Sequence, residues 1–398
     1  MHTIHRIALT TSLALTVFCV HAQKSEAQRL IGSSTRLSDQ PVVPTNALAQ
    51  KQAPLRVAVV GLVHGHVAGF LPQLAHHPEI QLVGIEEADQ TIVSKYQSKY
   101  QLDPKLFYTD LNLMLERTHP QAILVYTDVQ DHRKAIETAA IHGISSMVEK
   151  PLTISLEDAL AIRKVAQLHH VHVLTNYETT WYASNREVHA ELEAGKLGEL
   201  RKMIVRDGHE GPKEIGVGPE FLNWLVDPGK NGAGALYDFG CYGVDLTTWL
   251  MHGETPISVT AETQTDKPSV YPGTDDDSVM VLRYPHTQAV ILGSWNWSFA
   301  VKNMEAYGTN GYAFTEGTNQ LHVRYKGQKE AALITAEAIP APHDNSLSYL
   351  YAVMTGRLDP KGDLSALDTN VIVVQILDAA RTSARTGKTI QLQPLPSQ

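Results

Sequence analysis

The pattern of apolar positions changes in the middle of the chain. From Leu55 onward, short and nearly continuous apolar runs alternate with amphipathic stretches of helical period. Such runs are typical of strands buried on both faces, and the stretches between them are typical of helices. The pattern predicts strands at 55–61, 80–86, 106–108, 122–127, 144–149 and 171–176, and helices at about 65–77, 90–100, 111–118, 131–142 and 155–170. This alternation predicts a parallel, doubly wound sheet over residues 55–176.

After Tyr177 the strands follow one another without helices between them. A helix at 184–195 and a strand at 200–207 precede a loop rich in Gly and Pro at 211–234. A helix is expected from near Gly234 to Leu250, and two helices close the chain at 345–356 and 365–386. Alternating strands are expected at 256–264, 278–285, 288–298, 303–307, 312–315 and 321–326. We therefore expect a C-terminal α+β domain at 177–398 with an open, mostly antiparallel sheet.

The N-terminus has the pattern of an export signal. Arg6 precedes an apolar run that ends at Val20, and Ala22 supplies a small residue before a cleavage point. This predicts a Sec-type signal peptide at 1–22, a flexible leader at 23–54, and a periplasmic or secreted location. A lipid anchor at Cys19 and a buried helix are the weaker alternatives.

The overall composition is that of a soluble globular protein. Charged residues make up 19% of the 398 residues, the formal net charge is −9, and no Lys/Arg run stands out. Nucleic acid is therefore not an expected partner, and no membrane span is predicted. Only Cys19 and Cys241 are present, so signal cleavage would leave no intrachain disulfide.

The first predicted strand leads into the turn Gly-Leu-Val-His-Gly-His. Gly61 and Gly65 are suited to a dinucleotide site, where backbone N–H groups meet the pyrophosphate, although Val63 stands where a second glycine is usual. The turn, including His64 and His66, is a candidate cofactor contact, and an ordinary tight turn is the alternative. The sequence shows no partner cluster for these two histidines, so no metal site is predicted.

An acidic pair, Glu86 and Glu87, ends the second predicted strand. A carboxylate at this distance from the first glycine can accept hydrogen bonds from the adenosine ribose. It would also repel a 2′-phosphate, which favours NAD over NADP. Exposed loop acids are the alternative reading.

A lysine ends the fifth predicted strand, within Glu149-Lys150-Pro151. This places Lys150 at the edge where doubly wound sheets bind ligands, and Pro151 restricts its backbone. Such a lysine can contact a substrate hydroxyl or assist proton transfer, whereas a surface lysine is the alternative.

Two further polar residues lie four positions apart, at Asp238 and Tyr242. On one helix they share a face, so both can meet the same small molecule. The alternative is that Asp238 caps the helix and Tyr242 is an interface aromatic.

The Gly turn, the acid, Glu-Lys-Pro and "GALYDFGCYGVD", in this order over about residues 55–395, resemble the Gfo/Idh/MocA oxidoreductases, in particular the glucose–fructose oxidoreductase branch with a catalytic Tyr. The resemblance implies a Rossmann-type NAD(P)-binding domain. It also implies that Lys150, Asp238 and Tyr242 are catalytic.

The resemblance further implies cofactor contacts from Thr127, His132 and Glu149. Substrate contacts are expected from Asn176 and Tyr177, although this segment lacks the arginines of the family. The variable segment that follows adds the candidates His209 and Trp224. The family also implies a homo-oligomer formed through the C-terminal sheet.

We therefore expect an exported oxidoreductase that moves a hydride from a sugar or glycoside hydroxyl to a tightly held NAD. The alternative is an NAD-dependent glycoside hydrolase that uses transient oxidation at C3 followed by elimination. A non-catalytic sugar sensor is a third, weaker possibility.

Overall fold

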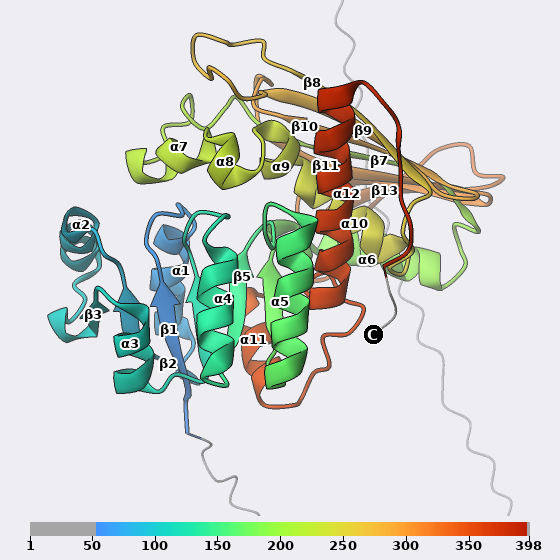
Figure 1. Cartoon of the computed structure of the whole chain (residues 1–398). Coiled ribbons are helices and arrows are strands. Elements are labelled where there is room, and N and C mark those ends of the chain that lie inside the picture. Colours follow the sequence, from blue (N-terminus) through green and yellow to red (C-terminus); the bar gives the residue numbers. More distant parts are fainter. Residues whose placement is uncertain (1–52, 396–398) are drawn as a thin grey trace, which may run out of the picture. The chain divides into compact units, whose positions relative to one another are not determined.

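The computed structural model describes residues 53–395 (Figure 1). The predicted signal peptide, and the leader up to residue 52, lie outside the described residues. Within residues 53–395, no helix is both long enough and apolar enough to cross a membrane.

The first sheet has six parallel strands in the order β3-β2-β1-β4-β5-β6, which confirms the predicted doubly wound sheet. The strands are β1 Leu55–Val60, β2 Ile80–Glu86, β3 Phe107–Tyr108, β4 Ala122–Val125, β5 Ser145–Glu149 and β6 Val173–Asn176. The helices between them are α1 Val67–Gln73, α2 Gln90–Tyr100, α3 Leu111–Thr118, α4 His132–Ile141 and α5 Leu156–His169. The central strand β4 is buried at every position, as its continuous apolar pattern predicts.

Local capping explains why several helices begin where the sequence predicts. Asp110 accepts a hydrogen bond from the backbone N–H of Leu113, and Ser155 accepts one from Asp158. Each bond satisfies an N–H group that the first helical turn leaves without a partner.

The second sheet has nine strands in the order β14-β13-β12-β11-β7-β10-β9-β8-β15. Its strands are β7 Leu200–Gly208, β8 Ser258–Gln264, β9 Asp277–Arg283, β10 Gln288–Ser294, β11 Val301–Gly308, β12 Gly311–Glu316, β13 Gln320–Tyr325, β14 Ala332–Thr335 and β15 Ile390–Gln391. Only the β7–β10 pair is parallel among these neighbours, so the mostly antiparallel sheet is confirmed. The short strands β14 and β15 were not predicted.

The helices of this half are α6 Ala183–Glu193, α7 Pro219–Leu225, α8 Pro228–Asn231, α9 Ala235–Asp238, α10 Gly240–Leu250, α11 Ser346–Met354 and α12 Leu367–Thr386. The segment predicted as a loop therefore contains α7 and α8. Each of these short helices begins with a proline, whose fixed backbone angle suits the first helical position.

The predicted helix from Gly234 to Leu250 is broken at Phe239. The carboxylate of Asp275 accepts the N–H groups of Gly234 and Leu236, which fixes α9 as a separate turn. At Gly240 an added Cβ would stand 2.5 Å from the Met280 methyl carbon, so a larger residue at the start of α10 would displace the end of that side chain.

The last two helices pack back onto the first half of the chain. Leu347, Leu350 and Val353 of α11 share an apolar core with strands β1 and β4. Helix α12 runs from the second sheet to α5, so both halves contribute to a continuous packed unit (Figure 1).

Candidate active site

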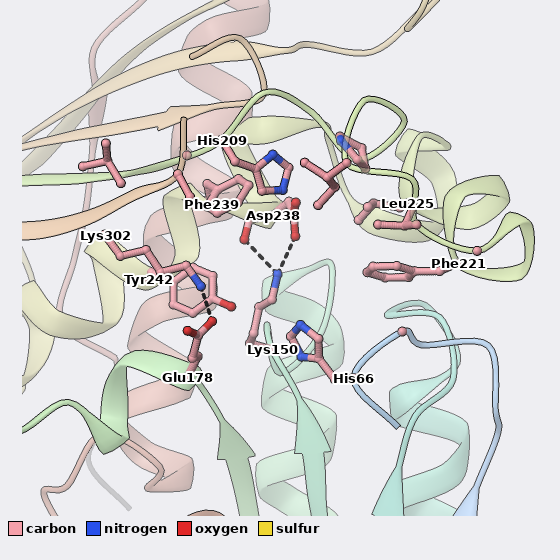
Figure 2. Close-up of a pocket in the computed structure, with 18 of the residues that line it drawn as sticks. His66, Lys150, Glu178, His209, Phe221, Leu225, Asp238, Phe239, Tyr242 and Lys302 are labelled. Carbon is pink, nitrogen blue, oxygen red and sulfur yellow. Dashed lines mark hydrogen bonds and ion pairs between the residues drawn. The ribbon is translucent and has the colours of Figure 1, made fainter. Parts of the chain in front are cut away.

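A cavity of about 630 Å³ lies at the carboxyl edge of the parallel sheet, where both halves of the chain meet. Figure 2 shows the side chains that surround it. Its polar lining comprises His66, Lys150, Glu178, Tyr182, His209, Asp238, Tyr242 and Lys302. Its apolar lining includes Pro212, Ile215, Val217, Phe221, Leu225, Phe239 and Val301.

Lys150 of the first half and Asp238 of the second form a buried ion pair in this cavity. The ammonium group contacts the Asp238 carboxylate and also donates to the Asp238 carbonyl oxygen at 2.9 Å. Trp295 donates its indole N–H to the other carboxylate oxygen at 2.8 Å. Burial acts to raise the pKa of Asp238, but the Lys150 charge and these hydrogen bonds outweigh it and hold the pKa below its usual value. Burial acts to lower the pKa of Lys150, but Asp238 raises it overall, so both groups are charged.

Tyr242 lies in the first turn of α10, beside two cations. Lys150 Nζ is 5.0 Å from the centre of its ring and Lys302 Nζ is 4.6 Å from it. Burial is the main cause that raises the pKa of Tyr242 well above its ordinary value, and Glu178 adds to it. The phenol is therefore protonated at neutral pH. Asp238 and Tyr242 line one cavity as predicted, although the helix expected to carry both is interrupted between them.

An ion pair between Lys302 and Glu178, which the sequence did not predict, closes one side of the cavity (Figure 2). Tyr182 donates its hydroxyl to the same Glu178 carboxylate. Lys302 lies on β11, opposite Asp207 of β7 in the antiparallel register. Nothing in the local sequence around Lys302 signals this position, because it depends on strand pairing over long range.

His209 follows β7 and lines the cavity, where the sequence placed a substrate contact. Its Nδ1 accepts the N–H of Gly211 at 2.9 Å, and its ring packs edge-on against Phe239. Burial lowers the pKa of His209, so the neutral ring carries its proton on Nε2. That N–H is a donor available to a ligand hydroxyl.

The Gly61–His66 turn connects β1 to α1 at the carboxyl edge of the sheet. Gly61 has a φ of 77°, and an added Cβ would stand 2.7 Å from the Thr127 side chain. Only glycine fits this turn, as a dinucleotide-binding turn requires.

The two acids at the end of β2, Glu86 and Glu87, have different surroundings. Both carboxylate oxygens of Glu87 accept backbone N–H groups at 2.9 Å, from Leu62 and Asp89. Glu87, which we expected on the ribose, thus orders the turn itself. Burial and the neighbouring Glu87 raise the pKa of Glu86 to about 7.

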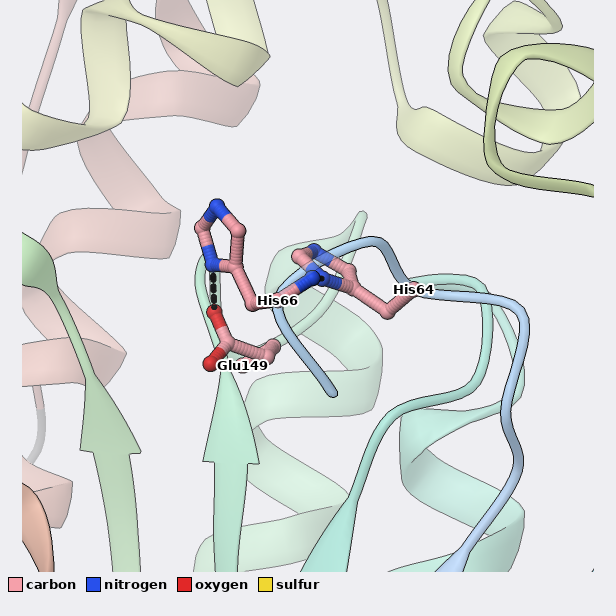
Figure 3. Close-up of side chains that lie close together, drawn as sticks. All are labelled: His64, His66 and Glu149. Atoms are coloured by element: carbon pink, nitrogen blue, oxygen red, sulfur yellow. Dashed lines mark hydrogen bonds and ion pairs between the residues drawn. The ribbon is translucent and has the colours of Figure 1, made fainter. Parts of the chain in front are cut away.

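His64, His66 and Glu149 form a cluster (Figure 3) with ligand atoms within 4.8 Å of one another. His66 Nδ1 pairs with Glu149 Oε2 at 2.9 Å. His64 Nδ1 accepts the His66 backbone N–H at 3.3 Å, which leaves the proton of the neutral ring on the buried Nε2. That Nε2 has no hydrogen-bond partner among residues 53–395. An N–H donor beside the positive charge of Lys150 suits an acceptor oxygen, such as one of a dinucleotide phosphate, better than a cation.

Glu149 also joins the turn to β6. Asn176 donates its amide to Glu149 Oε1 at 2.8 Å, and the Trp181 indole donates to Asn176. These residues, with His66, line a second cavity of about 420 Å³ next to α1 and the start of α11. Asn176, which we expected to contact the substrate, thus lies beside Glu149, an expected cofactor contact.

Thr127 and His132, two of the expected cofactor contacts, do not line the main cavity. The Thr127 hydroxyl donates to Asp128 O, and its methyl packs at Gly61. His132 is fully buried and its Nδ1 contacts the Leu152 carbonyl, so it supports the segment after Lys150 from behind.

Tyr177 and Trp224, two of the expected substrate contacts, do not line the main cavity either. Tyr177 is fully buried behind Tyr242, with ring centres 5.7 Å apart, so it supports that ring and does not face the cavity. Trp224 is buried against the Gly turn, where its indole donates to Val63 O at 3.3 Å. The burial of both residues depends on packing between distant segments, which their local sequence does not show.

Comparisons with known proteins place both halves of the chain in one family. Residues 55–177 match the model of an oxidoreductase family with an NAD-binding Rossmann fold, and residues 185–314 match a GFO/IDH/MocA C-terminal domain. An uncharacterized oxidoreductase of Synechocystis sp. is 26% identical over 50% of this chain and 52% of its own length. D-apiose dehydrogenase of Rhizobium rhizogenes is 23% identical over 67% of this chain and 78% of its own.

The fold has close counterparts among solved structures. The inositol dehydrogenase homologue of Azotobacter vinelandii, solved with NAD+, superposes with a TM-score of 0.73 at 21% identity, over 86% of this chain and 98% of its own. The chain spans about half the length of three of the curated relatives that it matches. The two family models together cover most of the described residues, and the chain belongs to the Gfo/Idh/MocA family of oxidoreductases.

Proposed function

We propose that this protein is an NAD-dependent oxidoreductase that acts on a hydroxyl group of a sugar or glycoside. The observation that carries the proposal is the meeting of Lys150 with Asp238 and Tyr242 in one cavity. This cavity lies at the edge of the parallel sheet where doubly wound folds bind their cofactors.

The residues of the first half fit a dinucleotide. The glycine-only turn at Gly61, the start of α1 and the unpaired His64 N–H would hold its phosphates, and Glu149 and Asn176 would accept and donate hydrogen bonds farther along the edge. When bound, NAD supplies the hydride acceptor. The acids Glu86 and Glu87 favour NAD over NADP because they would repel a 2′-phosphate.

Lys150 and Tyr242 act on the proton of the substrate hydroxyl. The ammonium of Lys150, fixed by Asp238, donates a hydrogen bond to the substrate oxygen and so stabilises the negative charge that develops there. Tyr242 Oη exchanges the proton with that oxygen. Because the pKa of Tyr242 is raised, the phenol is protonated at neutral pH. It can therefore act as the acid in carbonyl reduction, and it must first lose its proton before it can act as the base in alcohol oxidation.

The charges of the cavity favour a neutral, hydroxylated substrate. Lys150 is paired with Asp238 and Lys302 with Glu178, so no cation in the lining stands free for an anionic group within the described residues. The polar side chains face an apolar wall, which suits the mixed surface of a pyranoside. The sugar named for the D-apiose dehydrogenase relative supports the same substrate class.

We also infer that the protein is exported and forms a homo-oligomer through the second sheet. The N-terminal sequence pattern supports the export, and the family resemblance supports the oligomer. Because free NAD is scarce outside the cytoplasm, an exported enzyme needs a cofactor that stays bound and is regenerated in place.

The test combines cofactor identification with turnover. Purified protein is analysed by mass spectrometry for co-purified nucleotide, and then incubated with aldoses, polyols and aryl glycosides, with and without added NAD+ or NADP+. Reduction of the nicotinamide by a substrate, whether the nucleotide is the bound one or the added one, supports the dehydrogenase. Released phenol with many turnovers and no net reduction would instead indicate the glycoside hydrolase, and no nucleotide binding at all would refute the proposal.

A further inference from the structure

Helix α7 of the second half lies directly over the Gly61–His66 turn of the first half (Figure 1). A Cβ built on Gly65 would stand 2.9 Å from the ring of Phe221. The His64 ring is 4.8 Å from the Phe221 ring and 5.4 Å from the Trp224 ring, centre to centre. The turn expected to hold the cofactor phosphates is thus roofed by two aromatic side chains.

Three sets of polar contacts join helices α7 and α8 to the first half of the chain. The Trp224 indole donates to the Val63 carbonyl at 3.3 Å, and Glu220 pairs with Lys95 of α2. In the next helix, α8, the Lys230 side chain pairs with Asp128 at 3.1 Å. The backbone carbonyl of Lys230 accepts the N–H of Gln130. The contacts therefore reach the turn after β1, helix α2 and the turn after β4.

These attachment points lie along the path that a dinucleotide takes. In doubly wound sheets the dinucleotide crosses the carboxyl edge of the strands, with its pyrophosphate at the first turn. Helix α7 covers the middle of that path. In this structure α7 packs directly on the turn, so a ligand can bind to the turn beneath it, or leave, only when α7 moves.

The attachments are of a kind that can open. The Lys95–Glu220 pair is partly exposed, with 48% of the Lys95 side chain accessible, and such pairs contribute little to stability. Glycines with positive φ stand on both sides of the segment, Gly216 at 74° and Gly232 at 93°. Residues of this kind can absorb backbone changes at the ends of a moving element.

We propose that residues 216–232 form a lid that controls exchange of the cofactor. The inference rests on the proposed function, since it takes the ligand beneath the lid to be NAD. The same segment supplies Val217, Phe221 and Leu225 to the wall of the substrate cavity, so lid closure completes that cavity as well. Exchange of NAD is then slow compared with turnover, and the NADH formed from one alcohol substrate is reoxidised in place by the carbonyl group of a second sugar, which takes up the hydride.

The experiment measures the association and dissociation rates of NADH by stopped-flow fluorescence on the full-length protein. Glu220→Gln removes the ion pair with Lys95, which contacts neither Lys150 nor Tyr242 of the cavity. The variant should accelerate both rates about threefold to tenfold with little change in Kd. Phe221→Ala opens the roof and should accelerate both rates more than tenfold. Lys95→Gln should match Glu220→Gln, and the double variant should add nothing further, because the two residues form one contact.

Glu199→Gln is the matched control, since it removes an exposed ion pair with Arg201 on the second sheet. It should leave both rates unchanged. A rise in dissociation alone, with loss of affinity and of thermal stability, would mean that α7 is only a packing element, and would overturn the lid.

The outcomes separate this inference from the proposed function. If NADH binds and the lid variants keep the wild-type rates, the lid is refuted while the proposed function stands. If the wild type does not bind NADH, the proposed function is refuted and the lid inference falls with it, whether or not Phe221→Ala binds the nucleotide.

Discussion

Trp295 donates its indole N–H to Asp238 Oδ2 at 2.8 Å, and both side chains are buried. Trp295 follows the last residue of β10, so the second sheet reaches into the active site through this hydrogen bond. The carboxylate is held on one oxygen by Trp295 and on the other by Lys150. Asp238 therefore has little freedom to rotate, and Lys150 is fixed in turn.

Replacing this tryptophan should reveal its positioning role. Trp295→Phe keeps a ring but removes the donor, so the pKa of Asp238 rises and the Asp238–Lys150 pair loosens. We expect the acid limb of the kcat/KM profile to move to higher pH, and kcat to fall about tenfold, since a hydrogen bond to a charged group contributes about 1.5–3 kcal/mol. Trp297→Phe is the matched control, since the Trp297 ring packs at Gly208 of β7. An acid limb that stays in place in Trp295→Phe would contradict the positioning role of Trp295.

The buried ion pair predicts different effects for single and double variants. Lys150→Met leaves the Asp238 carboxylate buried without its cation and should lower the free energy of unfolding by about 3–5 kcal/mol. Lys150→Met/Asp238→Asn should recover most of that loss, because no unpaired charge remains. Neither variant should recover turnover, which we expect to fall at least about a hundredfold. Denaturant unfolding and turnover on the same samples test both statements, and an active double variant would refute the role of Lys150.

The raised pKa of Tyr242 predicts opposite pH dependences for the two reaction directions. Alcohol oxidation needs the phenolate and should increase with pH above neutrality, whereas carbonyl reduction needs the phenol and should decline at alkaline pH. Lys302→Met removes a cation 4.6 Å from the ring and should move the alkaline limb upward. Glu178→Gln removes an acid that raises the pKa, so it should move the limb downward.

Steady-state pH profiles in both directions measure these shifts. Tyr242→Phe is the control, because it should abolish the alkaline limb and most of the turnover while its ring still packs on Tyr177. If the Lys302 and Glu178 variants have the same pH profile, the alkaline limb reports a group other than Tyr242.

Local patterns in the sequence were enough to predict much of the first half. The limits of α2 and α3 agree with their predicted ranges, since their ends are set by nearby residues such as Asp110. Lys150 was predictable for a related reason, because the carboxyl end of a parallel strand has a fixed place in a doubly wound sheet.

The rest of the site depends on contacts between distant segments. Lys302 reaches the cavity through the pairing of β11 with β7, and no local period encodes that register. The roof over the Gly turn consists of α7, a helix of seven residues inside a segment that reads as a loop. The burial of His64, and of Trp224 within α7 itself, results from the contact between α7 and the turn. Their environments could therefore not be predicted from local sequence either.

Asp207 predicts a pH dependence of stability that is separate from catalysis. It is 1% exposed, and neither of its carboxylate oxygens has a hydrogen-bond partner within residues 53–395. Burial raises the pKa of Asp207 to about 8, against the opposing charge of Lys302. The folded state therefore holds a proton that the unfolded state loses at about pH 4, so this group lowers stability as the pH rises from about 4 to about 8.

Asp207→Asn removes that dependence, because an amide of similar shape stays neutral at every pH. We expect the variant and the wild type to have similar stability near pH 4, and the variant to gain with rising pH until it is more stable by about 2–5 kcal/mol near pH 8. Thermal and denaturant unfolding at several pH values measure the difference, with the exposed Asp344→Asn as control. If the difference in stability stays constant across this range, Asp207 is already ionised in the folded protein. Lys302 would then stabilise the buried carboxylate even though Asp207 accepts no hydrogen bond within the described residues.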